Sequence, residues 1–346
     1  MDKSINNNSI NLSEALAALH GRRQPITEGP SYEKLGSDYD PIFESITSSV
    51  SNEGIRYILG AMQPIPSWST NYLYQQGEYF SKDVITSVNL PLTFHFQGSV
   101  PLNVHIRSSS DLDILFIHSE KLYVPEVASQ YRYQHTDIDI RDVILSIKNK
   151  CIELFNQRLY NYEHNDKSVK ILNCLAVSAD IVPACWYHTQ KYQLSGREEE
   201  KGVAILKERE RKVLPNYPFK HIYLVKRRNI LYNDKIGKCI RLLKNIKADL
   251  PNSDTITLSS FDITSLIYYL PEYIHNFIKI NDGLPLARCL YDYIQYVLNN
   301  KNIFSLLFVP DKSRHIFDAT HKFSSLQALS NNLSEILKIA NQPVRY

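Results

Sequence analysis

The sequence predicts an α+β protein with two packed lobes, the first built from strands and helices and the second from helices alone. At 346 residues the chain is long for a single hydrophobic core. Its amino-terminal part contains apolar, strand-like runs at 94–97, 112–117 and 171–187. Beyond these runs, apolar residues recur instead at three- and four-residue steps, which predicts helices over 234–250, 259–270, 284–300 and 323–340.

These patterns divide the chain into three segments. Residues 1–40 are a loose segment, rich in Asn and Ser, with one short helix. Residues 41–218 contain the predicted strands, two helices ahead of the first strand, and a longer helix at 141–159. Within this segment, the polar stretch 187–218 is expected to be a solvated excursion with one hairpin strand. Residues 219–346 form the helical lobe.

The composition excludes several classes of protein. Hydrophobic residues make up 43% of the chain and charged residues 22%, which is typical of a folded globular protein rather than a disordered one. A net charge of only +3 argues against a dedicated duplex-binding protein. The five cysteines are widely spaced, so we expect reduced thiols in a cytoplasm. No apolar run reaches the roughly 18 residues of a membrane span, and we expect no membrane partner.

Three carboxylates stand out because they lie in or beside apolar strands. Asp111 and Asp113 are two residues apart at the start of the run that ends at Ile117, so their side chains point to the same side of a strand. Asp180 is the one carboxylate in the apolar run 171–187. Like charges held side by side, and a lone buried carboxylate, are both unfavourable unless a cation binds there. The pattern therefore predicts a site for a hard divalent metal, Mg²⁺ or Mn²⁺.

This arrangement is typical of two-metal phosphoryl transfer. One ion activates an attacking hydroxyl, the other neutralises the leaving pyrophosphate, and shared carboxylates hold both. The Gly98-Ser99 step precedes the acidic pair by eleven residues. A glycine allows the backbone to approach a ligand closely, and exposed amides with a serine hydroxyl can hold phosphate oxygens. We therefore expect two Mg²⁺ or Mn²⁺ ions as cofactors and nucleoside triphosphates as substrates.

The motif GS(x)11DxD, followed by a lone Asp in a hydrophobic strand, resembles the polymerase β-like nucleotidyltransferase superfamily. Within it, five segments resemble the cGAS/DncV-like nucleotidyltransferases (CD-NTases) of bacterial anti-phage signalling: ADIVPA, NYP, CIRLLKNIK, LSSFDITSLIYYL and VPDKSRHIFD. The similarity spans roughly residues 90–320. It implies a polymerase β-like nucleotidyltransferase palm, a mixed β-sheet with flanking helices, packed against the carboxy-terminal helical lobe. The segment 41–218 would then be the catalytic core.

The resemblance also implies catalytic roles. Asp111 and Asp113 would bind both metals, whereas Asp180 would bind one metal and help to deprotonate the acceptor hydroxyl. The family usually has Gly-Thr at the positions of Asn103 and Val104, so this chain departs from the pattern in the loop between the Gly-Ser step and the acidic pair. No expected metal ligand is lost by that change.

Four residues are expected to hold the nucleotide: Gly98, Ser99, Lys244 and Ser260. Lys244 matches the lysine of the family's R-L-x-K helix, and on a helical wheel it lies at the margin of the apolar stripe, facing a cleft between the lobes. Ser259 and Asp262 form an S-x-x-D capping box, which places Ser260 in the first turn of a helix. Free amides and the helix dipole favour phosphate at that position.

The function that these features favour is the joining of nucleoside triphosphates into a cyclic di- or trinucleotide messenger, which would act on a downstream effector. Nucleotidyl transfer to RNA or protein is an alternative, motivated by the basic segments 207–212 and 226–228, although a solvated face is the better explanation of the basic run 220–228. A catalytically weak nucleotide-binding protein is a third hypothesis, motivated by Asn103-Val104. A second acidic pair, Asp137 and Asp139, precedes a helix and is interpreted as its N-cap.

Overall fold

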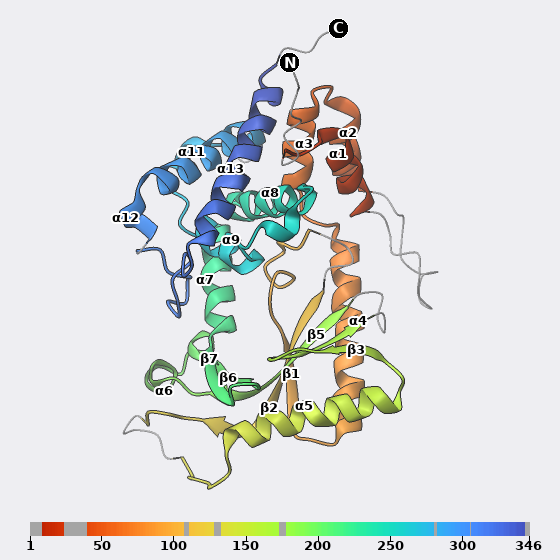
Figure 1. The fold of residues 1–346 in the computed structure, drawn as a ribbon, viewed down its shortest axis with the longest axis vertical. Coiled ribbons are helices and arrows are strands. Elements are labelled where there is room, and N and C mark those ends of the chain that lie inside the picture. Colours follow the sequence, from red (N-terminus) through yellow and green to blue (C-terminus); the bar gives the residue numbers. More distant parts are fainter. Residues whose placement is uncertain are drawn as a thin grey trace.

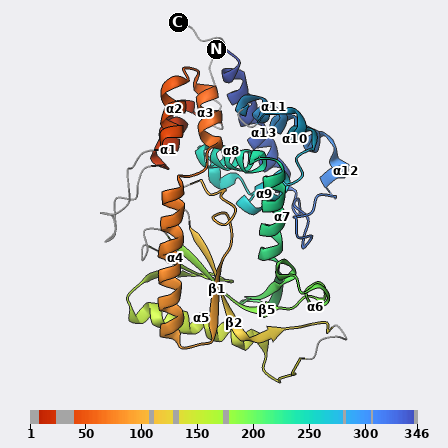
Figure 2. The same cartoon turned by 180° about the vertical axis from the view of Figure 1, so that it is seen from behind.

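The computed structural model has a helical lobe above a sheet lobe, as Figure 1 shows. It describes residues 9–23, 40–106, 111–127, 133–172, 178–279, 282–304 and 306–342. Two helices, α4 (Ser67–Val88) and α7 (Pro218–Leu231), run between the lobes on opposite sides of the molecule. The view from behind shows the same arrangement (Figure 2). Within the described ranges, no helix combines the length and the apolar character needed to span a membrane.

The sheet lobe contains one mixed, seven-stranded sheet centred on β5. The strands are β1 (Leu92–Phe96), β2 (Leu112–Tyr123), β3 (Asn161–His164), β4 (Val169–Leu172), β5 (Ala179–Tyr187), β6 (Gly202–Lys207) and β7 (Lys212–Asn216). Their order is β1-β2-β5-β4-β3, with β6 also pairing with β5 and with β7. Strands β2 and β5 are parallel, and every other pair is antiparallel. The predicted mixed sheet is therefore confirmed.

Two details of the sheet differ from the sequence-based expectation. The apolar run 171–187 is not one strand, because β4 ends at Leu172 and β5 begins at Ala179, and the two pair antiparallel. The stretch 187–218 is not a wholly solvated excursion, because β6 and β7 form a hairpin that extends the sheet and the residues of β6 are mostly buried. The sequence predicted a solvated stretch here because charged residues lie on either side of β6.

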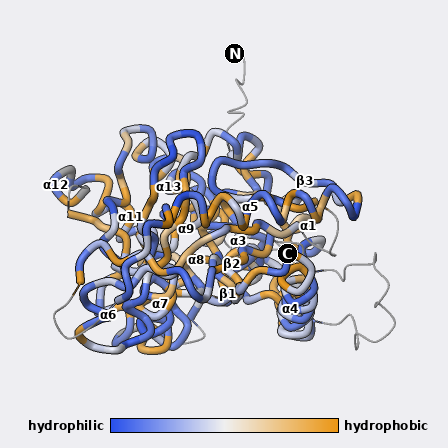
Figure 3. The backbone as a smooth tube through the Cα atoms, turned by 90° about the horizontal axis from the view of Figure 1, so that it is seen from below, coloured by the Kyte–Doolittle hydropathy of each residue, from blue (hydrophilic) through white to orange (hydrophobic). Residues whose placement is uncertain are grey.

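The two faces of the sheet have different environments. On one face, α4 and α5 (Ile140–Gln157) pack on a buried layer that includes Leu112, Ile114 and Ile181. Viewed from below (Figure 3), α5 alternates between hydrophobic and hydrophilic residues, as a helix with one buried side should. On the opposite face, Leu115 and Val182 belong to a smaller cluster against the start of α7. Because strand side chains alternate, that second face also carries Asp113 and Asp180, which precede Leu115 and Val182 by two positions.

The helical lobe is built from both ends of the chain. Its elements are α1 (Leu12–Gly21), α2 (Pro41–Ser49), α3 (Glu53–Met62), α8 (Lys235–Asp249), α9 (Ser260–Ile267), α10 (Tyr273–Phe277), α11 (Gly283–Asn299), α12 (Lys301–Phe304) and α13 (His321–Ala340). One hydrophobic cluster joins residues of α1 and α3 to residues of α8, α11 and α13. We therefore propose that the domain division lies within the connection to α4 rather than at residue 40, so that α1 to α3 belong with the carboxy-terminal helices.

A substitution at the close contact between α3 and α13 tests this division. Gly54 packs so tightly that a Cβ there would lie 2.5 Å from the Ala340 backbone nitrogen and 2.8 Å from the Ile336 carbonyl oxygen. We expect Gly54→Ala to lower the free energy of unfolding by about 1 to 3 kcal/mol, because two backbones would have to move apart. Urea denaturation measures this loss.

Gly21→Ala in α1 is the matched control. Nothing lies within 4 Å of a Cβ at Gly21, so alanine there should leave the stability unchanged or raise it slightly, as alanine does in an uncrowded helix. Equal stability of the Gly54→Ala protein and the wild type would mean that α3 does not pack on α13 in this way.

Candidate active site

The three predicted carboxylates lie at neighbouring positions on two adjacent strands. Asp113 of β2 and Asp180 of β5 are direct partners in the parallel register, and Asp111 immediately precedes β2. Asp113 precedes Leu115 and Asp180 precedes Val182 by two positions, so both aspartates lie on the sheet face that α4 and α5 leave open. The tertiary structure therefore brings together carboxylates that are about seventy residues apart in the chain.

The electrostatics of this group favour a bound cation. Burial, reinforced by the nearby carboxylates of Asp180 and Asp111, raises the pKa of Asp113 to about 7. The Oδ1 atom of Asp180 is buried and has no hydrogen-bond partner within the described part of the chain. An unpaired buried oxygen and a carboxyl with a raised pKa are both stabilised by a nearby positive charge. Carboxylate oxygens are also the ligands that Mg²⁺ and Mn²⁺ prefer.

The donor set thus fits a hard divalent ion, although its side chains are not already gathered around a metal position. Across the residues described, no three His, Cys, Asp or Glu side chains form a ready-made metal-binding group. The carboxylate of Asp111 is occupied, because its Oδ2 atom accepts a hydrogen bond of 2.5 Å from Nζ of Lys170 on β4. Lys170 was not expected from the sequence.

The Gly-Ser step lies directly against the acidic pair. Gly98 has a φ of 76°, which favours glycine, and a Cβ there would lie 2.0 Å from Oδ2 of Asp113. The amide of the preceding residue, Gln97, donates a 2.9 Å hydrogen bond to the Asp113 carbonyl. Only glycine therefore allows the loop to pass this close to Asp113. Ser99 follows and lines the same cavity.

The departure at Asn103-Val104 leaves the backbone of the loop intact. Asn103 has a φ of 54°, a left-handed conformation that glycine adopts freely and that asparagine tolerates better than most residues. The Val104 amide donates to the Ser99 carbonyl, and the Val104 side chain is buried. Arg241 donates to the Asn103 carbonyl. The change from the family's Gly-Thr thus removes one hydroxyl and keeps the turn.

Lys244 connects the helical lobe to this loop. Its Nζ atom donates a 2.8 Å hydrogen bond to the Val104 carbonyl, and the residue is 7% exposed. Burial lowers the pKa of Lys244 to about 8, although the negative charge of Asp113 acts in the opposite direction. The sequence-based expectation that Lys244 faces a cleft between the lobes agrees with this position.

Ser260 occupies the first turn of α9, as the capping box predicts. The Ser259 hydroxyl accepts from the Asp262 amide, and the Asp262 carboxylate accepts from the Ser259 amide, which completes the box. Asp262 is held in turn by Arg314 at 2.6 Å. The cap therefore fixes the start of α9, where Ser260 is exposed to the cavity.

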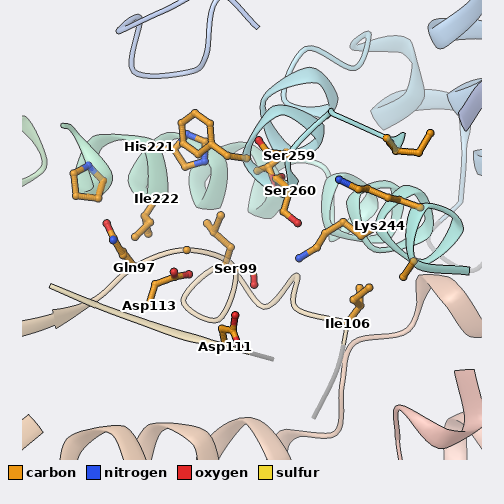
Figure 4. Close-up of a pocket in the computed structure, with 18 of the residues that line it drawn as sticks. Gln97, Ser99, Ile106, Asp111, Asp113, His221, Ile222, Lys244, Ser259 and Ser260 are labelled. Carbon is orange, nitrogen blue, oxygen red and sulfur yellow. The ribbon is translucent and has the colours of Figure 1, made fainter. Parts of the chain in front are cut away.

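A cavity of about 790 Å³ lies between the lobes and gathers six of the seven predicted residues: Gly98, Ser99, Asp111, Asp113, Lys244 and Ser260. Asp180 is not among the residues that line it. Figure 4 shows Lys244 and Ser260 approaching from the helical lobe, opposite Ser99, Asp111 and Asp113. The cavity is thus bounded by both lobes, and its polar side chains converge on a common space.

Sequence reasoning missed the aromatic end of the cavity. The rings of His221 on α7 and Phe261 on α9 stack with centroids 4.3 Å apart, and both residues line the cavity. Burial lowers the pKa of His221 to about 4, so the imidazole is neutral near pH 7. Phe261 lies directly after Ser260, and this adjacency is the one signal in the sequence that could have indicated an aromatic side chain at the site.

The second acidic pair is unrelated to the cavity. Asp139 is the N-cap of α5, and its side chain accepts a 2.9 Å hydrogen bond from the Arg141 amide. The interpretation of this residue as a helix cap is confirmed. In the basic segment 207–212, Lys207 pairs with Glu210, and Arg211 pairs with Asp142.

Comparisons with known proteins agree with this fold. No family model matches the chain. The chain is 31% identical over 293 residues to the cyclic dinucleotide synthase CdnE of Yersinia aleksiciae, an alignment that covers 83% of this chain and 76% of the relative. It is 28% identical over 349 residues to a c-di-GMP synthase of Capnocytophaga granulosa, covering 92% of this chain and 95% of the relative.

The solved structure of the STING-associated CdnE c-di-GMP synthase from Capnocytophaga granulosa has the same fold. It superimposes with a TM-score of 0.75 at 24% identity, over 95% of this chain and 98% of that chain. The predicted polymerase β-like palm packed against a helical lobe is thereby confirmed. Together with the likeness to the Yersinia protein, this shows that the chain belongs to the cGAS/DncV-like nucleotidyltransferase (CD-NTase) family.

Proposed function

We propose that this protein is a metal-dependent nucleotidyltransferase that joins nucleoside triphosphates into a cyclic di- or trinucleotide second messenger. One observation carries the proposal: Asp111, Asp113 and the Gly98-Ser99 step line one side of a single cavity, and Lys244 and Ser260 line it from the helical lobe. A cavity of this size, with acidic groups on one wall and phosphate-binding groups on the other, suits a triphosphate. Because several relatives are named c-di-GMP synthases, GTP is the first substrate to test.

Each residue has a role that follows from its position. Asp111 and Asp113 would hold two Mg²⁺ or Mn²⁺ ions, with Asp180 as a ligand of one. When bound, these ions supply a lowered pKa of the attacking hydroxyl and charge neutralisation at the leaving pyrophosphate. Asp180, with its unpaired buried Oδ1, is placed to accept the proton of the acceptor hydroxyl.

The Gly-Ser step and groups of the helical lobe would hold the triphosphate. Backbone amides at Gly98 and Ser99 come close to the metal-binding carboxylates because Gly98 lacks a side chain. The ammonium of Lys244 and the free amides at the start of α9, near Ser260, add positive potential from the helical lobe. Binding a triphosphate would therefore draw the two walls of the cavity together around one ligand.

The wider role follows from the product. A cyclic nucleotide would be released in a cytoplasm and would act on a separate effector, in keeping with the STING-associated solved relative. We propose nucleoside triphosphates as the substrates, with no role for a membrane or for nucleic acid. Transfer to RNA or protein is less favoured, because Lys207 and Arg211, in one of the two basic segments that motivated it, are engaged in ion pairs. A weak binding protein is less favoured, because the loop at Asn103-Val104 keeps its backbone contacts.

Product analysis tests the proposal directly. The purified protein is incubated with all four labelled nucleoside triphosphates and Mg²⁺ or Mn²⁺, treated with phosphatase, and examined by mass spectrometry. We expect a phosphatase-resistant cyclic di- or trinucleotide that contains guanine. Label on a macromolecule would instead support transfer to RNA or protein. Nucleotide binding without release of pyrophosphate under either metal would support the weak-binding alternative.

Asp180→Asn tests the role of the carboxylate on β5. We expect turnover to fall by at least about 100-fold, because the variant loses both a metal ligand and the group that accepts the proton. The folded protein should survive, and without metal its melting temperature should stay equal or rise, because an unpaired buried carboxylate is removed. Asp139→Ala is the control and should lower stability while leaving turnover near normal, because it removes only a helix cap. Loss of turnover in Asp139→Ala but not in Asp180→Asn would show that Asp180 is not one of the catalytic carboxylates.

The raised pKa of Asp113 gives a prediction for pH dependence. In metal-free protein the folded state binds this proton more tightly than the unfolded state, whose carboxyl has a pKa of about 4. The stability contribution of Asp113 is therefore highest below about pH 4, falls as the pH rises to about 7, and stays low above that. Asp113→Asn should raise the melting temperature in EDTA at about pH 8 and change it little at about pH 4. A difference independent of pH would show that Asp113 is not held protonated by its surroundings.

A further inference from the structure

A row of four charged residues crosses the open face of the sheet. In the strand register Asp113 on β2 is opposite Asp180 on β5, Asp180 is opposite Lys170 on β4, and Lys170 is opposite Glu163 on β3. Directly opposed residues in a sheet point to the same side, so the four side chains form a line of signs: negative, negative, positive, negative. The positive member thus lies between the proposed metal ligands and an outlying glutamate.

The lysine in this row bonds to the carboxylate at the entrance of the site. Nζ of Lys170 lies 2.5 Å from Oδ2 of Asp111, and the two side chains are 28% and 45% exposed. The contact reaches past Asp180, the direct strand neighbour of Lys170, to a residue outside the sheet register. Lys244, the other ammonium near the carboxylates, donates to the Val104 carbonyl. Within the described part of the chain, Lys170 is therefore the lysine that pairs directly with a carboxylate of the acidic group, whereas Lys244 acts on Asp113 through its charge alone.

We propose that Lys170 is an internal counter-ion, which holds Asp111 in the metal-free protein and which a divalent metal has to displace from that carboxylate in order to bind. The proposal rests on the assignment of Asp111 as a metal ligand. Its physical basis is competition: one carboxylate oxygen cannot approach an ammonium and a divalent ion closely without the two cations repelling each other. Lys170 therefore stabilises the empty site and weakens the affinity for metal.

Glu163 provides a place for the displaced ammonium. It is exposed and directly opposite Lys170 in the antiparallel β3–β4 pair, where Cβ atoms are typically about 5 Å apart. A long lysine side chain can turn from Asp111 to Glu163 without any change in the backbone. The displacement then exchanges one ion pair for another instead of leaving a charge unpaired, which keeps its cost small.

A purely structural role for Lys170 makes a different prediction. If the lysine only ties β4 to the residue that precedes β2, its removal should lower stability and leave metal affinity unchanged or weaker, since the ligands would be less well ordered. A counter-ion gives the opposite sign for metal affinity. The sign of the change therefore separates the two roles, whatever happens to stability.

Lys170→Gln decides the question with Mn²⁺ as the probe. Free Mn²⁺ is measured by electron paramagnetic resonance as it is titrated into the full-length protein without nucleotide. We expect Mn²⁺ to bind about fivefold more tightly to Lys170→Gln than to the wild type, which corresponds to about 1 kcal/mol for a partly exposed ion pair. In EDTA the variant should melt at a lower temperature, and added Mn²⁺ should raise its melting temperature more than that of the wild type.

Lys148→Gln is the matched control. It removes the lysine of another ion pair in the same lobe, with Glu208 at 2.6 Å, away from the proposed metal ligands. It should lower the melting temperature and leave the affinity for Mn²⁺ as in the wild type. An equal or weaker affinity of Lys170→Gln for Mn²⁺, or no binding of Mn²⁺ to any of the proteins, would overturn the proposal.

A double-mutant cycle tests the place of the displaced lysine. Glu163→Gln should weaken Mn²⁺ binding in the wild-type background and have a smaller effect in the Lys170→Gln background. Only the wild-type background retains the Lys170 ammonium that Glu163 is proposed to pair with. Equal effects in both backgrounds would rule out this position. Product formation is assayed in parallel, so that the counter-ion role of Lys170 and the proposed function are tested separately. Tighter Mn²⁺ binding by Lys170→Gln, without any joined nucleotide from the wild type, would support the counter-ion role and refute the proposed function.

Discussion

The structure of this protein depends on one constraint, the repulsion between carboxylates that the sheet holds in register. Asp113 and Asp180 are direct neighbours on parallel strands, and neither can move away without breaking the β2–β5 ladder. The ladder itself is fixed, because its other face is buried under α4 and α5. The repulsion has therefore to be balanced by protons, lysines or metal ions, and the raised pKa of Asp113 and the Lys170–Asp111 pair show two of these solutions.

The second lobe contributes the positive side of the site. Helix α8 is buried over most of its length, and two of its basic residues, Arg241 and Lys244, donate to the consecutive carbonyls of Asn103 and Val104. Arg241 also bonds to the Met62 carbonyl and to Asp234. These bonds tie the loop after the Gly-Ser step to the helical lobe, so that the phosphate-binding groups and the carboxylates face each other at a fixed separation. An enzyme that handles triphosphates needs this pre-organisation, because ordering the groups at the time of binding would weaken affinity.

The relation between stability and function is visible in the same residues. A cluster of carboxylates that is ideal for metal ions is unfavourable in the protein without metal, and functional sites commonly keep such strain. Lys170 reduces the strain at the edge of the cluster, and Lys244 reduces it from above. Oδ1 of Asp180 is buried without a hydrogen-bond partner in the described part of the chain, which is why its substitution is expected to affect activity and metal-free stability in opposite directions.

The sequence alone determined the chemistry and much of the fold. The spacing of Asp111 and Asp113, the lone carboxylate at Asp180 and the Gly98-Ser99 step predicted two-metal phosphoryl transfer, because charges within hydrophobic runs are visible without coordinates, and the resemblance of this motif implied a nucleotidyltransferase. Helical periodicity likewise predicted α8, α9, α11 and α13 closely, since each buries one side in a core.

Only the tertiary structure decided the contacts between distant segments. Nothing in the local sequence of Lys170 or His221 distinguishes them from other lysines and histidines, because their roles arise from strand register and from helix packing across the lobes. The same holds for α1 to α3, whose apolar stripes show that they are buried but not that their partners are α8 and α13, more than 170 residues later. Amphipathic patterns specify that a face is covered, whereas the choice of what covers it is made by shape and topology in the folded chain.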